Sequence, residues 1–343
     1  MSVTQMSQIY QDRVALYPMP YPWADLAYEE HERCHWVFDI VPLTNDVADF
    51  FRADNKTKQL ITDILFLFTQ SDVDIGKAYY ERYIPLFKHV ELRAMMGSFA
   101  SREATHFKAY SLLNKTLGLP DSSFTEFVNI KPMFDKHDYL EQIFNTKLSM
   151  DPLQHYKEIA IFSGFVEGFS LFSSFAILAS FAKTGVGKFF GTKNIVQYSA
   201  QEESMHFKYM LLLAKTIKEE NPELDWDSVD KVLVEEIIPE IWKREIAFVK
   251  YLFRDIEDGS DYHIDGNMVI NFLGSIVADR CKDLCIPLPD CIEYDHNDHV
   301  VRTTFDNMIQ LPEFANFFET RATGYIRGGV KGSLSDGTIA WPM

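Results

Sequence analysis

Hydrophobic residues recur along most of this chain at intervals of three and four, the spacing of one face of an α-helix. Short breaks interrupt the pattern, as at Gly118 and Pro120 and again at Pro222, and no segment alternates in the way of a half-buried strand. Short breaks favour antiparallel neighbours, so the pattern predicts an all-α helical bundle. The predicted helices span roughly 24–36, 56–83, 89–117, 136–147, 153–183, 191–219, 228–256 and 266–286.

The predicted helix over 153–183 is unusual because its stretch 159–182 is apolar on every face and holds one ionisable residue, Glu167. A buried carboxylate needs a cation, a metal or a proton as its partner. The stretch is long enough to span a membrane. Its central acid, its five serines and the lack of a flanking basic cluster favour a buried core helix instead.

Two Glu-x-x-His motifs, Glu103–His106 and Glu203–His206, lie about 100 residues apart on two other predicted helices. Residues three apart share one face of a helix, so each motif directs a carboxylate and an imidazole to the same side. One such motif often arises by chance. Two of them, together with lone acids on other core helices, are typical of a dinuclear metal site in a ferritin-like bundle.

The predicted helix over 56–83 offers two acids for this site. Asp72 shares a stripe with Phe68 and Ile75 and should point into the core, whereas Asp74 lies with polar residues and should face water or a subunit partner. The candidate metal ligands are therefore Asp72, Glu103, His106, Glu167, Glu203 and His206. Carboxylate-rich sites with some imidazole suit iron or manganese, and the alternative is a set of buried ion pairs without metal.

Composition narrows the remaining possibilities. The net charge of −17 argues against a surface for nucleic acid, which needs clustered Lys and Arg. The N-terminal residues lack the apolar region of a signal peptide, so we expect a cytoplasmic protein with reduced thiols and no membrane partner. An alternative zinc site fits no common ligand spacing. Its candidate ligands would be Cys281, Cys285, Cys291, His296 and His299.

The last segment differs from the rest of the chain. No linker or repeat precedes residue ~320, and we expect one domain over 1–319. From Thr320 to Met343 the chain has five glycines without periodicity and ends in Trp341-Pro-Met343. This composition predicts a mobile tail with an apolar end suited to docking on a partner. A packed or frayed terminus is the alternative.

The order Asp72, Glu103-x-x-His106, Glu167 and Glu203-x-x-His206 resembles the small, radical-generating subunit of class I ribonucleotide reductase. The resemblance extends from about Trp23 to Tyr325 and fills all six ligand positions. It implies two iron or manganese ions that react with O₂ or a reduced oxygen species. It also implies a homodimer and a large catalytic partner subunit that reduces ribonucleotides.

The resemblance assigns roles to further residues. Tyr110, four residues after His106, matches the tyrosine that becomes a stable radical, while the second motif has Met210 at the matching position. Trp36 matches a tryptophan on the electron and proton path toward the partner. Family members usually link that tryptophan to a histidine ligand through an aspartate, where this chain has the longer Glu202. An ordinary core tyrosine and a core anchor are the alternatives for Tyr110 and Trp36.

The tail of such subunits docks on the large subunit and carries a tyrosine for radical transfer. Tyr325 is the candidate here, with Trp341 in the terminal anchor. The loop near 183–193 departs from the common length. Two rival functions use the same bundle, a stand-alone di-metal oxidase of a small apolar substrate and a storage or binding protein. Neither rival needs Trp36 or the tail, and storage does not need Tyr110.

Overall fold

The computed structural model describes residues 7–12, 15, 17–181, 189–256 and 264–309. The chain divides into two compact units, Met1–Ile309 and Gln310–Met343. The predicted boundary at residue 319, the tail with Tyr325 and its terminal anchor all lie outside the described residues, as does most of the 183–193 loop. Within the described residues all regular structure is helical, with no strand.

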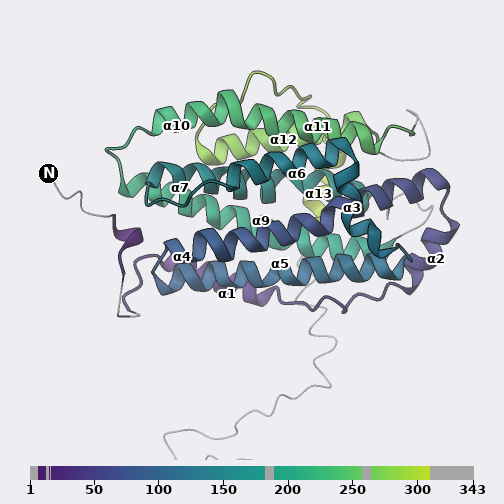
Figure 1. Cartoon of the computed structure of the whole chain (residues 1–343), viewed down its shortest axis with the longest axis horizontal. Coiled ribbons are helices and arrows are strands. Elements are labelled where there is room, and N and C mark those ends of the chain that lie inside the picture. Colours follow the sequence, from purple (N-terminus) through teal and green to yellow (C-terminus); the bar gives the residue numbers. More distant parts are fainter. Residues whose placement is uncertain (1–6, 13–14, 16, 182–188, 257–263, 310–343) are drawn as a thin grey trace, which may run out of the picture. The chain divides into compact units, whose positions relative to one another are not determined.

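Four long helical segments lie side by side with their axes aligned and form the central bundle (Figure 1). They are α3 (Asn55–Ala78), α5 (Val90–Thr116), α9 (Phe190–Glu220) and a continuous segment made of α7 (Pro152–Ile159), the π-helix η4 (Ala160–Ser170) and α8 (Phe172–Ser180). α3 packs against α5, α5 against α9, and α9 against η4 and α8. The shared interior of these segments is the core of the protein.

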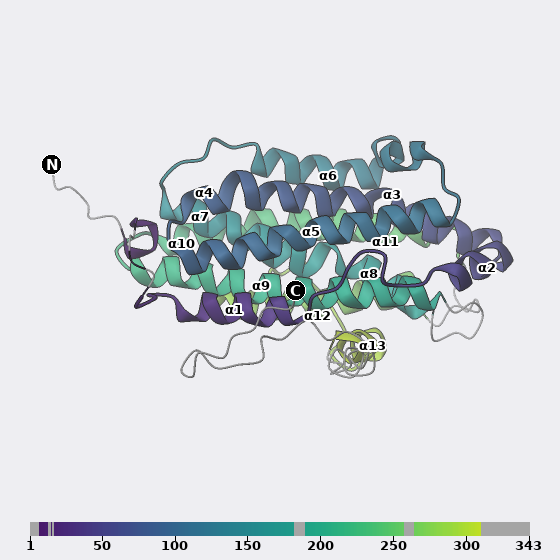
Figure 2. The same ribbon diagram turned by 90° about the horizontal axis from the view of Figure 1, so that it is seen from below.

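The other helices cover this bundle. α1 packs along α5 and α9, α6 lies between α3 and α11, and α12 packs on η4. α13 is seen end-on in Figure 2, so it crosses the direction of the bundle. These covering and connecting elements are η1 (Gln8–Tyr10), α1 (Pro22–Arg33), α2 (Thr44–Arg52), the π-helix η2 (Tyr79–Tyr83), α4 (Ile84–Leu86), η3 (Asp121–Asn129), α6 (Lys131–Phe144), α10 (Trp226–Val232), the π-helix η5 (Leu233–Ile237), α11 (Ile238–Leu252), α12 (Gly266–Leu284) and α13 (Val300–Ile309).

The predicted all-α architecture is confirmed, and each predicted helix has a counterpart in the structure. The pattern missed the short helices α2 and α13 and the 3-10 helix η3, which are too short to show several helical repeats. The predicted helices over 56–83, 153–183 and 228–256 each contain a π-helical segment. A π-helix changes the hydrogen-bond spacing without a change in composition, so the sequence carries no sign of it.

The apolar segment that could have crossed a membrane is a core element. Pro152–Ser180 is long and apolar enough to span a bilayer, and its apolar window is 100% buried inside the structure. Gly168 lies where η4 passes close to α9, because a Cβ there would stand 3.1 Å from Phe207 Cγ. The absence of a side chain allows the two elements to approach closely at this position.

Aspartate side chains define where several helices begin. Asp54 accepts a hydrogen bond from Thr57 N at the start of α3, which satisfies a backbone donor without an intrahelical partner. The long helix α9 is held from outside, because buried Asp46 of α2 accepts from Gly191 N and Thr192 N at 3.0 and 2.7 Å. A carboxylate at this end also suits the positive pole of the helix. The short helix α2 thus anchors the helix that carries the second Glu-x-x-His motif.

Candidate metal centre

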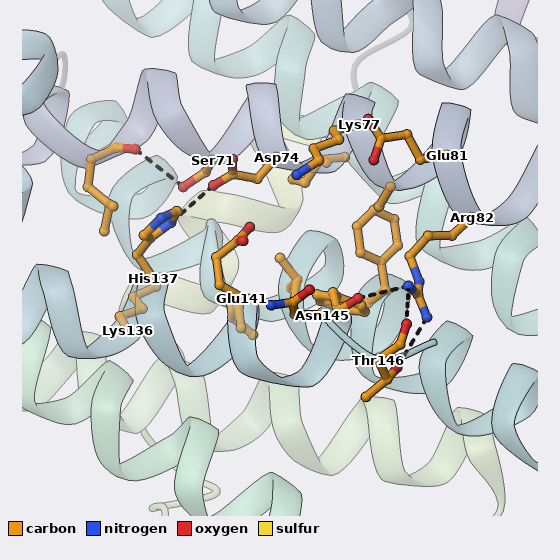
Figure 3. A pocket seen from close by; sticks show the side chains of 17 residues that line it. Ser71, Asp74, Lys77, Glu81, Arg82, Lys136, His137, Glu141, Asn145 and Thr146 are labelled. Carbon is orange, nitrogen blue, oxygen red and sulfur yellow. Dashed lines mark hydrogen bonds and ion pairs between the residues drawn. The ribbon is translucent and has the colours of Figure 1, made fainter. Parts of the chain in front are cut away.

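The structure brings all six predicted ligand residues together in the bundle interior, where each is at most 2% exposed. α3 contributes one, α5 two, η4 one and α9 two. In that order they are Asp72, Glu103, His106, Glu167, Glu203 and His206. The other candidate acid of α3, Asp74, points elsewhere and lines a pocket between α3, α6 and η4 (Figure 3).

The six side chains form two overlapping groups, and within each group the potential ligand atoms lie within 4.8 Å of one another. Glu103 and Glu203 belong to both groups. Asp72 and His106 complete the first group, and Glu167 and His206 would complete the second. A carboxylate has two oxygens, so each of the two shared carboxylates could contact two ions. The arrangement is that of a dinuclear site.

Unsatisfied polar atoms test whether these residues fit a metal pair. Asp72 Oδ2, both carboxylate oxygens of Glu103 and of Glu203, and Nδ1 of His106 and of His206 are buried and have no hydrogen-bond partner among the described residues. His206 Nδ1 lies 3.0 Å from Glu103 Oε1 without the geometry of a hydrogen bond. Buried polar atoms left unpaired are costly. Four carboxylates would also balance the charge of two divalent cations, so the donor set fits.

In the metal-free site, bound protons can balance the negative charge of the carboxylates. Burial raises the pKa of Asp72 well above its usual value and that of Glu167 to about 7. Burial alone would lower the pKa of the two histidines, but the surrounding carboxylates outweigh it and raise the pKa of both His106 and His206. The cluster therefore attracts positive charge, whether as protons or as metal ions.

Glu202 links the first group to Trp36. Its Oε2 accepts hydrogen bonds from His106 Nε2 at 2.8 Å and from Trp36 Nε1 at 2.9 Å, so the longer arm reaches both partners. Arg102 Nε donates to Glu202 Oε1 at 2.7 Å. Burial would raise the pKa of Glu202, but the hydrogen bond from His106 and the charges of His106 and Arg102 lower it to about 2. Sequence reasoning missed Arg102, which directly precedes Glu103.

His31 of α1 supports the second group in a different way. His206 Nε2 lies 3.1 Å from His31 Nε2, and His31 Nδ1 lies 2.8 Å from Ser98 Oγ, whose hydroxyl donates to Glu32 Oε1. Burial lowers the pKa of His31 to about 2, so this imidazole is neutral and can accept the proton of His206 Nε2. Sequence reasoning missed His31, because one buried histidine on α1 carries no motif.

Two buried tyrosines flank the cluster. Tyr110 is fully buried, its hydroxyl donates to Ser199 Oγ at 3.0 Å, and burial and the charge of Asp72 raise its pKa. Tyr79 is also fully buried and donates to Glu167 Oε1 at 2.9 Å. Sequence reasoning assigned no role to Tyr79, although Tyr79 follows Asp72 by two helical turns on the same stripe.

Neither alternative metal arrangement gathers a comparable set of buried ligands. In the part of the chain that the structure describes, no group of potential metal ligands contains a cysteine, and all four cysteines are free. The third potential group comprises Asp74, His137 and Glu141 at the mouth of the surface pocket. There His137 Nδ1 lies 3.1 Å from Asp74 Oδ2, which is an ion pair at a partly exposed position.

Known proteins resemble this chain over most of its length. The family model described as "Ribonucleotide reductase, small chain" matches residues 13–287. The "Probable ribonucleoside-diphosphate reductase small subunit 376L" of Invertebrate iridescent virus 6 is 33% identical over 348 residues, covering 93% of this chain and 95% of that protein. The "Ribonucleoside-diphosphate reductase subunit beta" of Chlamydia pneumoniae is 26% identical, covering 92% of this chain and 90% of that protein.

Solved structures share the fold. The ribonucleotide reductase R2 subunit from Clostridium botulinum has a TM-score of 0.74 at 15% identity, over 87% of this chain and 92% of that one. The dimanganese(II)-NrdF of Streptococcus sanguinis has a TM-score of 0.69 at 18% identity, over 88% of this chain and 100% of that one. This likeness confirms the predicted ferritin-like bundle. The family match also disfavours the stand-alone oxidase, and the chain belongs to the ribonucleotide reductase small chains, as its sequence predicted.

Proposed function

We propose that this small subunit holds two iron or manganese ions and generates a tyrosyl radical on Tyr110 for a large catalytic subunit. The observation that carries the proposal is the pair of overlapping ligand groups, with their unsatisfied buried atoms. Glu103 and Glu203 would contact both ions. Asp72 and His106 would complete one position and Glu167 and His206 the other. The Streptococcus sanguinis neighbour is a dimanganese protein, which supports manganese beside iron as a candidate.

When bound, the metal pair would supply oxidising power through its reaction with O₂ or a reduced oxygen species. Tyr110 holds its proton at the hydroxyl oxygen, with Ser199 Oγ as the hydrogen-bond acceptor at 3.0 Å. Its ring is fully buried and packs edge-on against Phe68, with ring centroids 4.5 Å apart. Burial excludes water and other reductants, which suits a long-lived radical. The raised pKa of Tyr110 keeps the phenol protonated until it is oxidised.

The route out of the site would begin at His106 and pass through Glu202 to Trp36. Hydrogen bonds of 2.8 and 2.9 Å join these three residues, and the ring centroids of Trp36 and His106 lie 6.1 Å apart. Arg102 holds Glu202 and donates to the Trp36 carbonyl at 3.0 Å. We propose that the route continues through Tyr325 of the tail to the large subunit.

The first experiment tests the radical. Metal-free protein is loaded with Fe(II) or Mn(II), exposed to O₂ or superoxide, and studied by electron paramagnetic resonance. We expect a tyrosyl signal in the wild type and its loss in Tyr110→Phe. The matched variant Tyr79→Phe removes the other buried tyrosine beside the cluster, and a radical on Tyr110 should survive it. Uptake of two metals without any organic radical would refute the mechanism.

The second experiment tests the partner and the tail. We propose that the subunit acts as a homodimer in the cytoplasm and docks on the large subunit through residues 320–343. Truncation after Glu319 should abolish binding to the large subunit in an ultracentrifugation assay, with the metal content and the dimeric state unchanged. A truncated chain that still binds the large subunit would place the docking surface elsewhere.

A further inference from the structure

We infer that Tyr79 is a positioning residue for one of the two metal positions, the one that uses Glu167 and His206. This inference rests on the proposed function, because it takes the six buried side chains as ligands. Glu167 and His206 occur in one ligand group only, whereas Glu103 and Glu203 are shared. A residue that holds the unshared pair therefore acts on one metal and leaves the other alone.

Tyr79 contacts both unshared residues. Its hydroxyl donates to the Glu167 carboxylate and lies 2.9 Å from Oε1 and 3.2 Å from Oε2. Its ring meets the His206 ring edge-on, with the centroids 6.3 Å apart and the planes at 77°. The side chain is 0% exposed, so no water competes for the hydroxyl. The Glu167 orientation is thus set by protein contacts.

The Tyr79 ring is itself held in place. Phe99, Phe162 and Tyr83 pack around it, with centroids 6.2, 5.5 and 6.0 Å away and steep angles between the planes. Edge-to-face packing of this kind is favourable and directional. Tyr79 also opens the π-helix η2, and Glu167 lies in the π-helix η4. Two π-helical segments therefore bring this donor and acceptor together, and such segments frequently mark functional sites.

The shared ligands have no such support. Both oxygens of Glu103 and both oxygens of Glu203 lack a hydrogen-bond partner within the described ranges. All four of these oxygens are therefore left for the metals. Glu167 is different, because the phenol occupies one side of its carboxylate and leaves the remaining lone pairs to a metal. Loss of an outer hydrogen bond to a ligand typically lowers metal affinity 10–100-fold.

The test is a titration of full-length metal-free protein with Mn(II), followed by calorimetry and by electron paramagnetic resonance. Tyr79→Phe keeps the ring and removes the donor. We expect the first equivalent to bind as in the wild type and the second to bind about 10–100-fold more weakly. The spectrum should then show isolated Mn(II) where the wild type shows a coupled pair. Unchanged binding of both equivalents would overturn the inference, and so would equal weakening of both.

Tyr83→Phe is the matched control. Tyr83 is equally buried and lies four residues further along η2. Its hydroxyl donates to the Glu158 carbonyl at 3.5 Å and, among the described residues, makes no hydrogen bond to a candidate ligand. We expect Tyr83→Phe to bind both equivalents of Mn(II) as the wild type does. If Tyr83→Phe selectively weakened the second equivalent, that result would also overturn the inference. If Tyr79→Phe does not fold, 3-fluorotyrosine at position 79 keeps the ring with a stronger donor. It should then alter the second equivalent alone, and no alteration would overturn the inference.

The wild-type titration separates this inference from the function on which it rests. Wild-type protein that fails to bind two Mn(II) or two Fe(II) would refute the proposed metal centre. Wild-type protein that binds two ions while Tyr79→Phe behaves identically would refute only the role of Tyr79.

Discussion

The buried pair of Arg102 and Glu202 offers a direct test of the electrostatics beside the metal centre. Both side chains lie in the core, at 5% and 1% exposure, and Arg102 Nε donates to Glu202 Oε1 at 2.7 Å. The guanidinium also lies 5.6 Å from the centre of the Trp36 ring. Arg102→Gln keeps most of the side-chain length and removes the positive charge. Glu202 then remains ionised in the core with its hydrogen bonds from His106 and Trp36 alone.

The expected loss in the free energy of unfolding can be worked out in two independent ways. Removing one partner of a buried ion pair costs about 3–5 kcal/mol, because the other charge stays uncompensated. The pKa of Glu202 falls from 4.5 to about 2 through His106 and Arg102 together, which corresponds to about 3 kcal/mol at neutral pH. Since Arg102 supplies only part of that lowering, the lower end of the range of about 3–5 kcal/mol applies, and we expect Arg102→Gln to lower the free energy of unfolding by about 3 kcal/mol.

Urea unfolding of metal-free protein at neutral pH measures this loss. Arg33→Gln is the control, because Arg33 pairs with Glu29 on the surface of α1 and such pairs contribute less than about 1 kcal/mol. The double variant Arg102→Gln/Glu202→Gln removes the uncompensated charge as well, so it should be more stable than Arg102→Gln alone. A loss below about 1 kcal/mol, or a double variant less stable than the single one, would refute this account of the pair.

Three further predictions follow from other parts of the structure. Gly168→Ala should lower stability by about 1–3 kcal/mol in thermal denaturation, because the new Cβ would stand 3.1 Å from Phe207 Cγ, whereas Gly97→Ala should not, having nothing within 4 Å. Asp46→Ala should cost about 1–2 kcal/mol, measured in the same way, because it strips the start of α9 of its carboxylate. Mn(II) affinity should rise with pH throughout titrations from pH 6 to 8, by at least about tenfold per pH unit below 7. Glu167, with its pKa of about 7, and His106 and His206, with their raised pKa, must each release a proton to bind a metal.

The helical period explains why so much of the site was readable from the sequence. Three-residue spacing places Glu103 beside His106 and Glu203 beside His206 on any regular helix, whatever surrounds it. The choice of Asp72 over Asp74 used the same rule, and the structure places Asp72 in the cluster and Asp74 at a surface pocket. These inferences need only the periodicity of one element.

The residues that the sequence did not assign make contacts between elements. Tyr79 and Glu167 are 88 residues apart, Arg102 and Glu202 are 100 apart, and His31 lies 175 residues from His206. Such contacts depend on which helices are neighbours and on how far each is shifted along its axis. The π-helical segments add to that shift, and the short helix α2 acts at the start of α9 through one aspartate. The local sequence pattern of a single helix contains no information about any of these contacts between helices.

Under the proposed ligand assignment, the two metal positions differ in what lies behind their histidines. His106 donates to the carboxylate of Glu202, and an anion at that place makes the imidazole a stronger donor to a metal. His206 is backed by the neutral imidazole of His31, and Glu167 by the neutral phenol of Tyr79. Higher metal charge is therefore favoured at the His106 position. Glu202 also accepts a hydrogen bond from Trp36. The carboxylate that supports the metal at the His106 position would therefore also form part of the route toward the partner subunit.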